Sequence, residues 1–556
     1  MRQTVTQQAA PGANKYLITL VAALGLIPII LDTTIVNVVL TPIRDALHTD
    51  INTAQWIISG YFLASAAIVA VGGYLGARFG RKRLFLLGLA LFTVGSALCA
   101  FAPSINWLIG FRVLQGLGGG ILLPIGPALA FDGFPQEERA KASAVIGVPL
   151  LLAPIFGPIV GGYLNDTFDW HSIFLINLPV GAIALLAALV VLPREQPATA
   201  RGPRFDIVGL ALSTIGIVTV VYAFTLVTRT NPATVTAANP TGDLYGWGYW
   251  LVWTLFGAGA LLLLIFAIYS QRVSRDPALD LRQLGRRDFL VSSIFSWATA
   301  LISFGLLVLL PLYLESVLLP GLSALDTGLA LVPFGAGGIV GTILAAALYR
   351  ALGPRVVVAL GAALSATSAW LLAHTVHPTA TASQLLAATQ THSAIPTVAS
   401  ADDVRWWLFL VGVSFTFMNI PVQTLALEAL NGEALAKASS LFLSTKLIFS
   451  SVGAALLTTL LVSYTRSRAT DLVGQLRAQA PGAGVNPTDP QVAVALRTLL
   501  AQVGVQAGTG AIQDIFWLIF YGSLGLLALA LILPGRRRTV ATEQAEAALT
   551  PAVSMS

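Results

Sequence analysis

Two charged side chains fall inside long apolar stretches of the sequence. Asp32 lies in the run 17–40, and Arg112 lies in the run 106–130. An unpaired charge inside a hydrocarbon layer costs on the order of a few kcal/mol, so each side chain must face a partner, water or a cavity. A carboxyl group that titrates can carry a proton or attract a cation, whereas a guanidinium keeps its charge at ordinary pH. The two residues indicate ion or proton chemistry in a membrane, with a structural hydrogen bond or helix bracing as the alternative roles.

The composition requires a bilayer as solvent. The chain has 556 residues, of which 56% are hydrophobic and only 10% are charged, and one soluble core cannot hide that much apolar surface. The net charge of +6 resides mostly in short loops, which indicates membrane orientation rather than nucleic-acid binding. The first apolar run passes Asp32 without a cleavage site, so we expect a retained helix and not a signal peptide. The single cysteine, Cys99, excludes an internal disulfide.

The apolar runs predict an all-α polytopic membrane protein with fourteen transmembrane helices of about 20 residues or slightly more. The spans are expected near 17–40, 54–76, 84–102, 106–130, 142–164, 172–192, 206–228, 249–269, 289–316, 325–349, 356–376, 405–429, 438–464 and 512–533. The expected organisation is a cytoplasmic N-terminus over 1–16, a six-helix bundle over 17–192, a linker with two extra helices over 193–287, a second six-helix bundle over 288–533 and a cytoplasmic tail over 534–556.

The basic residues predict the orientation of these spans. Counted on alternate sides of the membrane, Lys and Arg number 22 against 7, and the richer side is expected to be cytoplasmic together with both termini. The outer side then carries three long polar connections, 229–248, 378–404 and 466–511. We expect them to be exposed connectors, the last of them partly helical around 492–505.

A weak internal repeat relates the two bundles. Gly80 in the segment 73–83 and Gly353 in the segment 341–355 both stand among basic residues at the end of the second helix of a bundle. Duplicated halves of this kind are typical of secondary transporters, whose substrate path runs between the repeats.

Four motifs carry a resemblance to a known family. They are LDTTIVN at 31–37, GYLGARFGRKR at 73–83, RVLQGLGGG at 112–120 and APIFGPIVGG at 153–162. Together they resemble the fourteen-span drug:proton antiporters of the EmrB/QacA type within the major facilitator superfamily, over about 17–533. The resemblance implies a major facilitator fold, in which two six-helix bundles plus two extra helices alternately open a central cavity to each side.

The resemblance also assigns roles to residues of the motifs. It implies proton coupling by Asp32 and Arg112. It places the substrate cavity at Asp32, Asn37, Trp56, Tyr61, Glu315 and Lys446. For Trp56 and Tyr61 the alternative is an anchor at the membrane interface, and for Glu315 it is a side chain that reaches the outer interface.

Two further motifs imply conformational elements. The gating loop is expected at Gly73, Arg78, Gly80, Arg81 and Lys82, with positive-inside topology as the alternative explanation. Ala77 stands where the family usually has an aspartate, which removes the acidic partner of the gating network. The antiporter motif is expected at Pro154, Gly157, Pro158, Gly161 and Gly162, and it favours export over import.

These features predict proton-coupled efflux of hydrophobic or cationic drug-like compounds by alternating access. The alternative is an exporter or flippase of a lipid or amphipathic metabolite. No catalytic set, metal-spaced cluster or phosphate loop is visible, so we expect neither an enzyme nor a cofactor or metal, and the proton gradient is the energy source. The expected partners are an amphipathic small molecule, protons and membrane lipids, without nucleic acid. We expect a monomer in the cell inner membrane.

Overall fold

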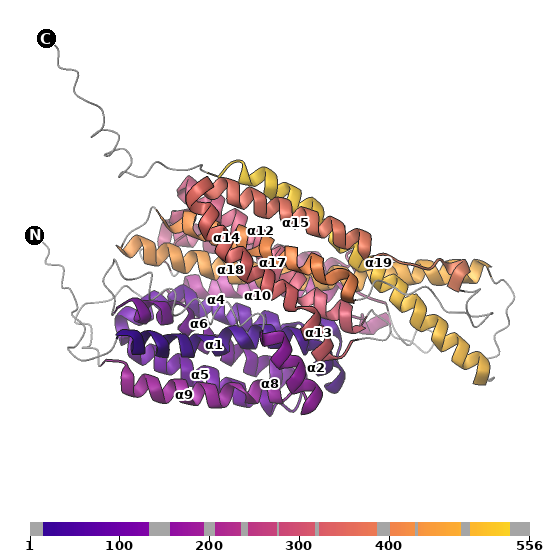
Figure 1. Ribbon diagram of the computed structural model, residues 1–556, viewed down its shortest axis with the longest axis horizontal. Coiled ribbons are helices and arrows are strands. Elements are labelled where there is room, and N and C mark those ends of the chain that lie inside the picture. The colour runs from indigo at the N-terminus through magenta and orange to yellow at the C-terminus, as the bar shows by residue number, and fades with distance from the viewer. Residues whose placement is uncertain are drawn as a thin grey trace, which may run out of the picture.

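The computed structural model describes residues 15–132, 156–193, 206–234, 243–274, 277, 279–316, 322–385, 401–428, 432–479 and 490–533. These residues are nearly all helical and contain no β-strand beyond one isolated bridge. The indigo and purple helices of the first half lie along one side of the molecule, and the orange and yellow helices of the second half lie along the other (Figure 1). The all-α fold expected from the sequence is confirmed.

The first half is held together by close helix packing around α6. Its described helices are α1 (Lys15–Val38), α2 (Leu40–Ala46), α3 (Ile51–Ala54), α4 (Trp56–Phe79), α5 (Arg81–Ala100), α6 (Ile105–Asp132), a helical stretch at 156–167, α8 (Ser172–Leu175) and α9 (Asn177–Val191). A Cβ added at Gly116 or Gly118 would lie 2.6 Å from the Tyr61 carbonyl oxygen or 2.4 Å from the Phe92 nitrogen. Small residues let helix backbones approach, so these glycines let α4 and α5 pack directly on α6.

Two helices follow this half in the chain. They are α10 (Ile207–Val227) and α11 (Trp250–Ile268), the second continued by the π-helical η3 (Tyr269–Val273), with a short 3-10 turn, η2 (Pro232–Thr234), between them. Asp206 caps α10 by accepting a hydrogen bond from the Gly209 amide at 2.9 Å, which satisfies one of the unpaired donors at the helix start. The α10 helix packs against α11, α4 and α18, and so contacts both halves.

The second half repeats the pattern of long helices. It contains η4 (Leu281–Gly285), α12 (Arg287–Ser316), α13 (Ala324–Ala330), α14 (Val332–Leu352), α15 (Pro354–Thr375), α17 (Ala401–Glu428), α18 (Gly432–Gln479) and α19 (Pro490–Ala530). The two halves meet mainly where α18 packs along α4 and where α12 packs against α1 and α2. This interface encloses the cavity described below.

Twelve helices of the described residues are long and apolar enough to cross a membrane. The span expected at 54–76 corresponds to α4, which has 24 residues, and the span expected at 142–164 lies partly outside the described residues. A count of fourteen therefore stays a prediction, as do the domain boundaries.

The internal repeat is visible in the backbone. Gly80, between α4 and α5, has φ 86°, and Gly353, between α14 and α15, has φ 82°. Both values lie in the left-handed region that glycine adopts without a steric penalty. The two halves thus make the same glycine turn at corresponding places.

The connector expected at 466–511 is helical over more of its length than predicted, and the helix expected around 492–505 is confirmed. The structure continues α18 to Gln479 and begins α19 at Pro490, so most of this stretch is helical. Leu476, Val503 and Leu385 form a small apolar cluster where the two extensions meet the chain after α15. The Arg468 guanidinium also pairs with the Asp514 carboxylate at 2.7 Å. These contacts stabilise helix beyond the hydrophobic spans, which hydropathy alone does not reveal.

Candidate functional site

Two intramembrane charged residues of the first half, Asp32 and Arg112, form an ion pair. Asp32 on α1 and Arg112 on α6 approach to 2.5 Å between Oδ2 and Nη1, and each side chain is only 1% exposed. Pro28 lies inside α1 one turn before Asp32. A buried pair of this kind holds both charges only if their remaining hydrogen bonds are made, and the neighbouring residues provide them.

Two neutral side-chain amides donate further hydrogen bonds to the Asp32 carboxylate. Gln115 Nε2 donates to Asp32 Oδ1 at 2.9 Å, and Asn177 Nδ2 donates to the same oxygen at 3.2 Å. Asn177 also donates to Ser96 Oγ at 3.0 Å, which fixes its orientation. Residues of three helices, α1, α6 and α9, therefore meet at the Asp32 carboxylate, and Ser96 on α5 holds Asn177 in place.

The Arg112 guanidinium has further partners besides the Asp32 carboxylate. Arg112 Nη1 donates to Gln115 Oε1 at 2.7 Å, and its Nε donates to the Ile57 carbonyl at 3.1 Å. Its central carbon lies 4.4 Å from the centroid of the Tyr61 ring, at a cation–π distance. Even without the carboxylate, the Arg112 guanidinium would retain its contacts with Gln115 on α6 and with Ile57 and Tyr61 on α4.

Sequence reasoning found the two charges but gave no role to the amides. Gln115 lies three residues after Arg112 on one helix, which places both side chains on the same face, and this spacing was a readable signal. Asn177 follows a short helical break after α8, and no periodic pattern in the sequence connects it to Asp32.

A cavity of about 360 Å³ lies between the two halves. This volume falls in the range of about 300 to 1,000 Å³ of small-molecule sites. Its lining is mainly apolar and comes from both halves: Ile29, Ile30, Thr33, Thr34, Asn37, Val38, Tyr61, Phe62, Ser65, Leu123 and Pro158 from the first, and Ser303, Phe304, Leu307, Leu331, Phe334, Phe415, Leu443, Lys446, Leu447 and Ser450 from the second. We call this space the central cavity.

Three of the predicted cavity residues line the central cavity. Asn37 lies on α1, Tyr61 lies on α4, and Lys446 lies on α18. The Asn37 Oδ1 and the Tyr61 hydroxyl are buried without a hydrogen-bond partner among the described residues. Both polar atoms can therefore meet a ligand or water. Tyr61 also contacts Arg112, so one ring joins the cavity to the ion pair.

The other three predicted cavity residues do not belong to this lining, so a contact between them and a substrate stays a prediction. Asp32 is engaged by Arg112 and the amides. Trp56 donates from Nε1 to Thr225 Oγ1 on α10 at 3.1 Å. Glu315 lies at the end of α12, with both carboxylate oxygens buried and without a hydrogen-bond partner among the described residues. The residue as a whole is half-buried, and the alternative of a side chain that reaches the outer interface stays open.

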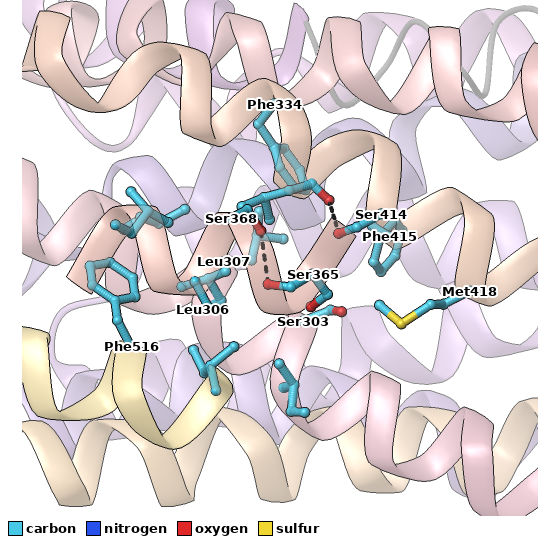
Figure 2. Close-up of a pocket in the computed structure, with 16 residues that line it drawn as sticks. Ser303, Leu306, Leu307, Phe334, Ser365, Ser368, Ser414, Phe415, Met418 and Phe516 are labelled. Atoms are coloured by element: carbon cyan, nitrogen blue, oxygen red, sulfur yellow. Dashed lines mark hydrogen bonds between the residues drawn. The ribbon is translucent and has the colours of Figure 1, made fainter. Parts of the chain in front are cut away.

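A smaller space adjoins the central cavity within the second half. It has a volume of about 20 Å³, roughly room for one water molecule. Figure 2 shows serine side chains gathered around it, and Ser368 donates to the Ser365 carbonyl at 3.0 Å while Ser414 donates to the Val411 carbonyl at 2.8 Å. The two spaces share the lining residues Ser303, Leu307, Phe334 and Phe415. The two spaces are therefore neighbours, and the smaller one has the more polar lining.

The glycines of the antiporter motif bring the halves into backbone contact at the end of the bundle that carries α2 and α13. A Cβ added at Gly162 would lie 2.4 Å from the Ala324 carbonyl oxygen, and one at Gly328 would lie 2.3 Å from the Pro158 carbonyl oxygen. The Leu325 amide donates to Asp166 at 2.9 Å across the same contact. This end is tightly closed among the described residues.

The remaining motif residues are placed as follows. On α1, Thr34 and Ile35 contact Gly157 and Gly161 closely, whereas Pro154 lies outside the described residues.

In the gating loop, Lys82 Nζ donates to the Leu189 carbonyl at 3.0 Å and to the Leu192 carbonyl at the end of α9. A lysine at a helix C-terminus satisfies carbonyls that lack a partner. Arg81 begins α5, and Gly73 and Arg78 lie in α4, where their side chains are outside the described residues.

Comparison with known proteins places this architecture in a family. Residues 22–279 match the Major Facilitator Superfamily. The chain is 32% identical over 406 residues to the multidrug resistance protein B homologue of Mycobacterium tuberculosis (strain CDC 1551 / Oshkosh), covering 73% of this chain and 68% of that protein. It is 28% identical over 532 residues to the multidrug export protein EmrB of Escherichia coli (strain K12), covering 94% of this chain and 96% of that protein.

A solved structure agrees on the fold. A bacterial homologue of the human lysosomal transporter Spinster, in an inward-facing and unoccupied conformation, superposes with a TM-score of 0.56 at 16% identity, over 95% of this chain and 98% of that chain. At this identity the likeness concerns the fold alone. The relatives and the fold together identify a multi-pass membrane transporter rather than an enzyme, and the chain belongs to the major facilitator superfamily, in its EmrB/QacA-type family of drug exporters.

Proposed function

We propose that this protein exports hydrophobic, drug-like small molecules in exchange for protons by alternating access. In this proposal it lies in the inner membrane with both termini in the cytoplasm, and it needs no cofactor besides the proton gradient. The observation that carries the proposal is the buried Asp32–Arg112 pair, which contacts the central cavity through Tyr61.

The pair provides a means for proton binding to change the cavity. Protonation of Asp32 neutralises the carboxylate and removes its attraction for Arg112, while the amides of Gln115 and Asn177 still bond a neutral carboxyl group. Helix α1, which carries Asp32, also carries Thr33 and Asn37 of the cavity lining. A movement of α1 relative to α6 therefore alters the cavity directly.

The energy available is sufficient for useful export. A gradient of one pH unit supplies about 1.4 kcal/mol for each proton, which is about a tenfold concentration ratio of an exchanged neutral substrate. Coupling requires that proton binding accompanies the change of state, and the Asp32 carboxylate is a candidate for the proton site because it is buried where α1, α6 and α9 meet. The closed contact of Gly162 with α13 separates the cavity from one end in the present state.

The test is transport in proteoliposomes with an imposed pH gradient, using ethidium and 8-anilinonaphthalene-1-sulfonate as fluorescent probes. We expect Asp32→Asn to lose the gradient-driven movement that the wild type shows. Asp45→Asn is the matched control, because Asp45 is an exposed carboxylate on α2 that pairs only with its neighbour Arg44 among the described residues.

Two outcomes would contradict this proposal. Equal gradient-driven movement by the wild type and by folded Asp32→Asn would remove Asp32 from the coupling mechanism. No movement of either probe by folded wild type would direct attention to the alternative substrate class, a lipid or an amphipathic metabolite.

A further inference from the structure

The charge in the central cavity belongs to a lysine. Lys446 is the sole ionisable acid or base, apart from the Tyr61 phenol, among the described residues that line the cavity. No carboxylate of the described residues forms an ion pair with it. The rest of the lining is apolar or carries neutral hydroxyl and amide groups. In its protonated form Lys446 therefore presents a positive charge to an entering molecule.

An ammonium group in such surroundings selects its ligands by charge. A charge in an apolar environment is costly unless it is paired or hydrated. An anion that enters the cavity supplies the missing counter-charge, whereas a cation must approach a like charge. The apolar lining on both sides favours the burial of a hydrophobic body at the same time.

For a cation in the central cavity, the lining contains no carboxylate that could act as a counter-charge. Asp32 is outside the lining, and its two oxygens already accept three hydrogen bonds, from Arg112, Gln115 and Asn177. With Arg112 at 2.5 Å, the local charge of this cluster is balanced. Glu315 also lies outside the lining, toward α2 and α13. Neither carboxylate is available to a molecule in the central cavity without a rearrangement.

Two polar atoms in the lining can orient such a ligand. The Tyr61 hydroxyl is a hydrogen-bond donor, the Asn37 Oδ1 is an acceptor, and both are buried without a partner among the described residues. A phenol can donate to a carboxylate or sulfonate oxygen. The lining thus combines one positive charge, one free donor and a mainly apolar wall.

We infer that the central cavity selects acidic amphiphiles, in which an apolar body carries one carboxylate, phenolate or sulfonate group that pairs with Lys446. This inference rests on the proposed export function for its physiological meaning and narrows the substrate class of that function. It differs from the prediction of hydrophobic or cationic compounds made from the sequence, because it favours hydrophobic anions over cations.

Binding of two ions with the same shape and opposite charge tests the inference. Tetraphenylborate and tetraphenylphosphonium differ mainly in the sign of their charge, and their affinities for the purified protein in neutral detergent can be compared without a pH gradient. We expect the wild type to bind tetraphenylborate at least tenfold more tightly. Lys446→Gln should lose most of this preference through weaker anion binding, and Lys446→Arg should keep it.

Lys15→Gln is the matched control, because Lys15 lies at the start of α1 and outside the cavity lining. It should bind both ions as the wild type does. Equal affinity of the wild type for the two ions, or tighter binding of the phosphonium ion, would overturn the inference even if the Lys446 variants do not fold. So would unchanged anion affinity in folded Lys446→Gln.

This test is independent of the one for proton coupling. Loss of gradient-driven transport with the anion preference intact would contradict the export mechanism and leave the binding site standing. Gradient-driven transport without the anion preference would contradict the site and leave the mechanism standing.

Discussion

Replacement of Gly162 by alanine should shift the protein away from the state described above. The added Cβ would lie 2.4 Å from the Ala324 carbonyl oxygen and 2.5 Å from the Leu325 Cα. Both are backbone atoms, so no side-chain rotation removes the overlap. The contact joins the two halves, and a state in which this end is open does not contain it.

The size of the shift follows from the geometry. Ordinary contact between such atoms requires about 1 Å more separation than is present. Overpacking of a well-packed interior costs about 1–3 kcal/mol, and this cost applies only to the closed state. The population ratio of the open state to the closed state should therefore rise about 5- to 150-fold.

Double electron–electron resonance between spin labels at Thr167 and Leu329, one on each half, measures this population. Both residues are exposed, and Cys99→Ala removes the native thiol, which is buried. Gly110→Ala is the control, since a Cβ at Gly110 has nothing within 4 Å. A Gly162→Ala distance distribution identical to that of the wild type would refute the reasoning.

Three other substitutions have defined expectations for thermal unfolding in detergent. Asp32→Asn alone should lower the stability by at least about 3 kcal/mol because it leaves Arg112 buried and unpaired, and adding Arg112→Gln should recover part of that loss; additive effects would contradict a coupled pair. Glu315→Gln should unfold no earlier than the wild type, because both carboxylate oxygens lack a hydrogen-bond partner among the described residues; a clear drop in Tm would reveal a partner. Arg468→Gln should cost no more than about 1 kcal/mol because its pair with Asp514 is partly exposed, and a double-mutant cycle with Asp514→Asn measures that pair.

Hydropathy predicts most of the fold because a bilayer imposes a simple length rule. Runs of about 20 apolar residues lie where the long helices are found, and the glycines at 80 and 353 mark equivalent turns. Helix around 492–505, in the extension of α19, was predicted, whereas the extension of α18 was not, because tertiary contacts contribute to its stability. Leu476 and Val503 pack together in a region whose average composition is polar.

The candidate site was predictable in part. A charge within an apolar run requires a partner, and this argument found Asp32 and Arg112, but their mutual pairing depends on how α1 and α6 pack. Lys446 was expected in the cavity and lines it. Glu315 was placed in the cavity by the family resemblance, and neither a resemblance nor a span boundary tells which side of the helix faces the cavity. Three-dimensional packing decides that question.

The placement of the charges suggests a division of roles between the halves. A charge-balanced cluster around Asp32 lies in the first half, and the Lys446 side chain comes from the second half. If a proton enters while an acidic substrate leaves, two positive charges move inward in each cycle. A potential of 100 mV then contributes about 4.6 kcal/mol, twice the value for one elementary charge. Exchange of a proton for a monovalent cation moves no net charge, so a membrane potential would add nothing to it. The sign of the charge in the cavity therefore determines whether the membrane potential drives this transporter in addition to the pH gradient.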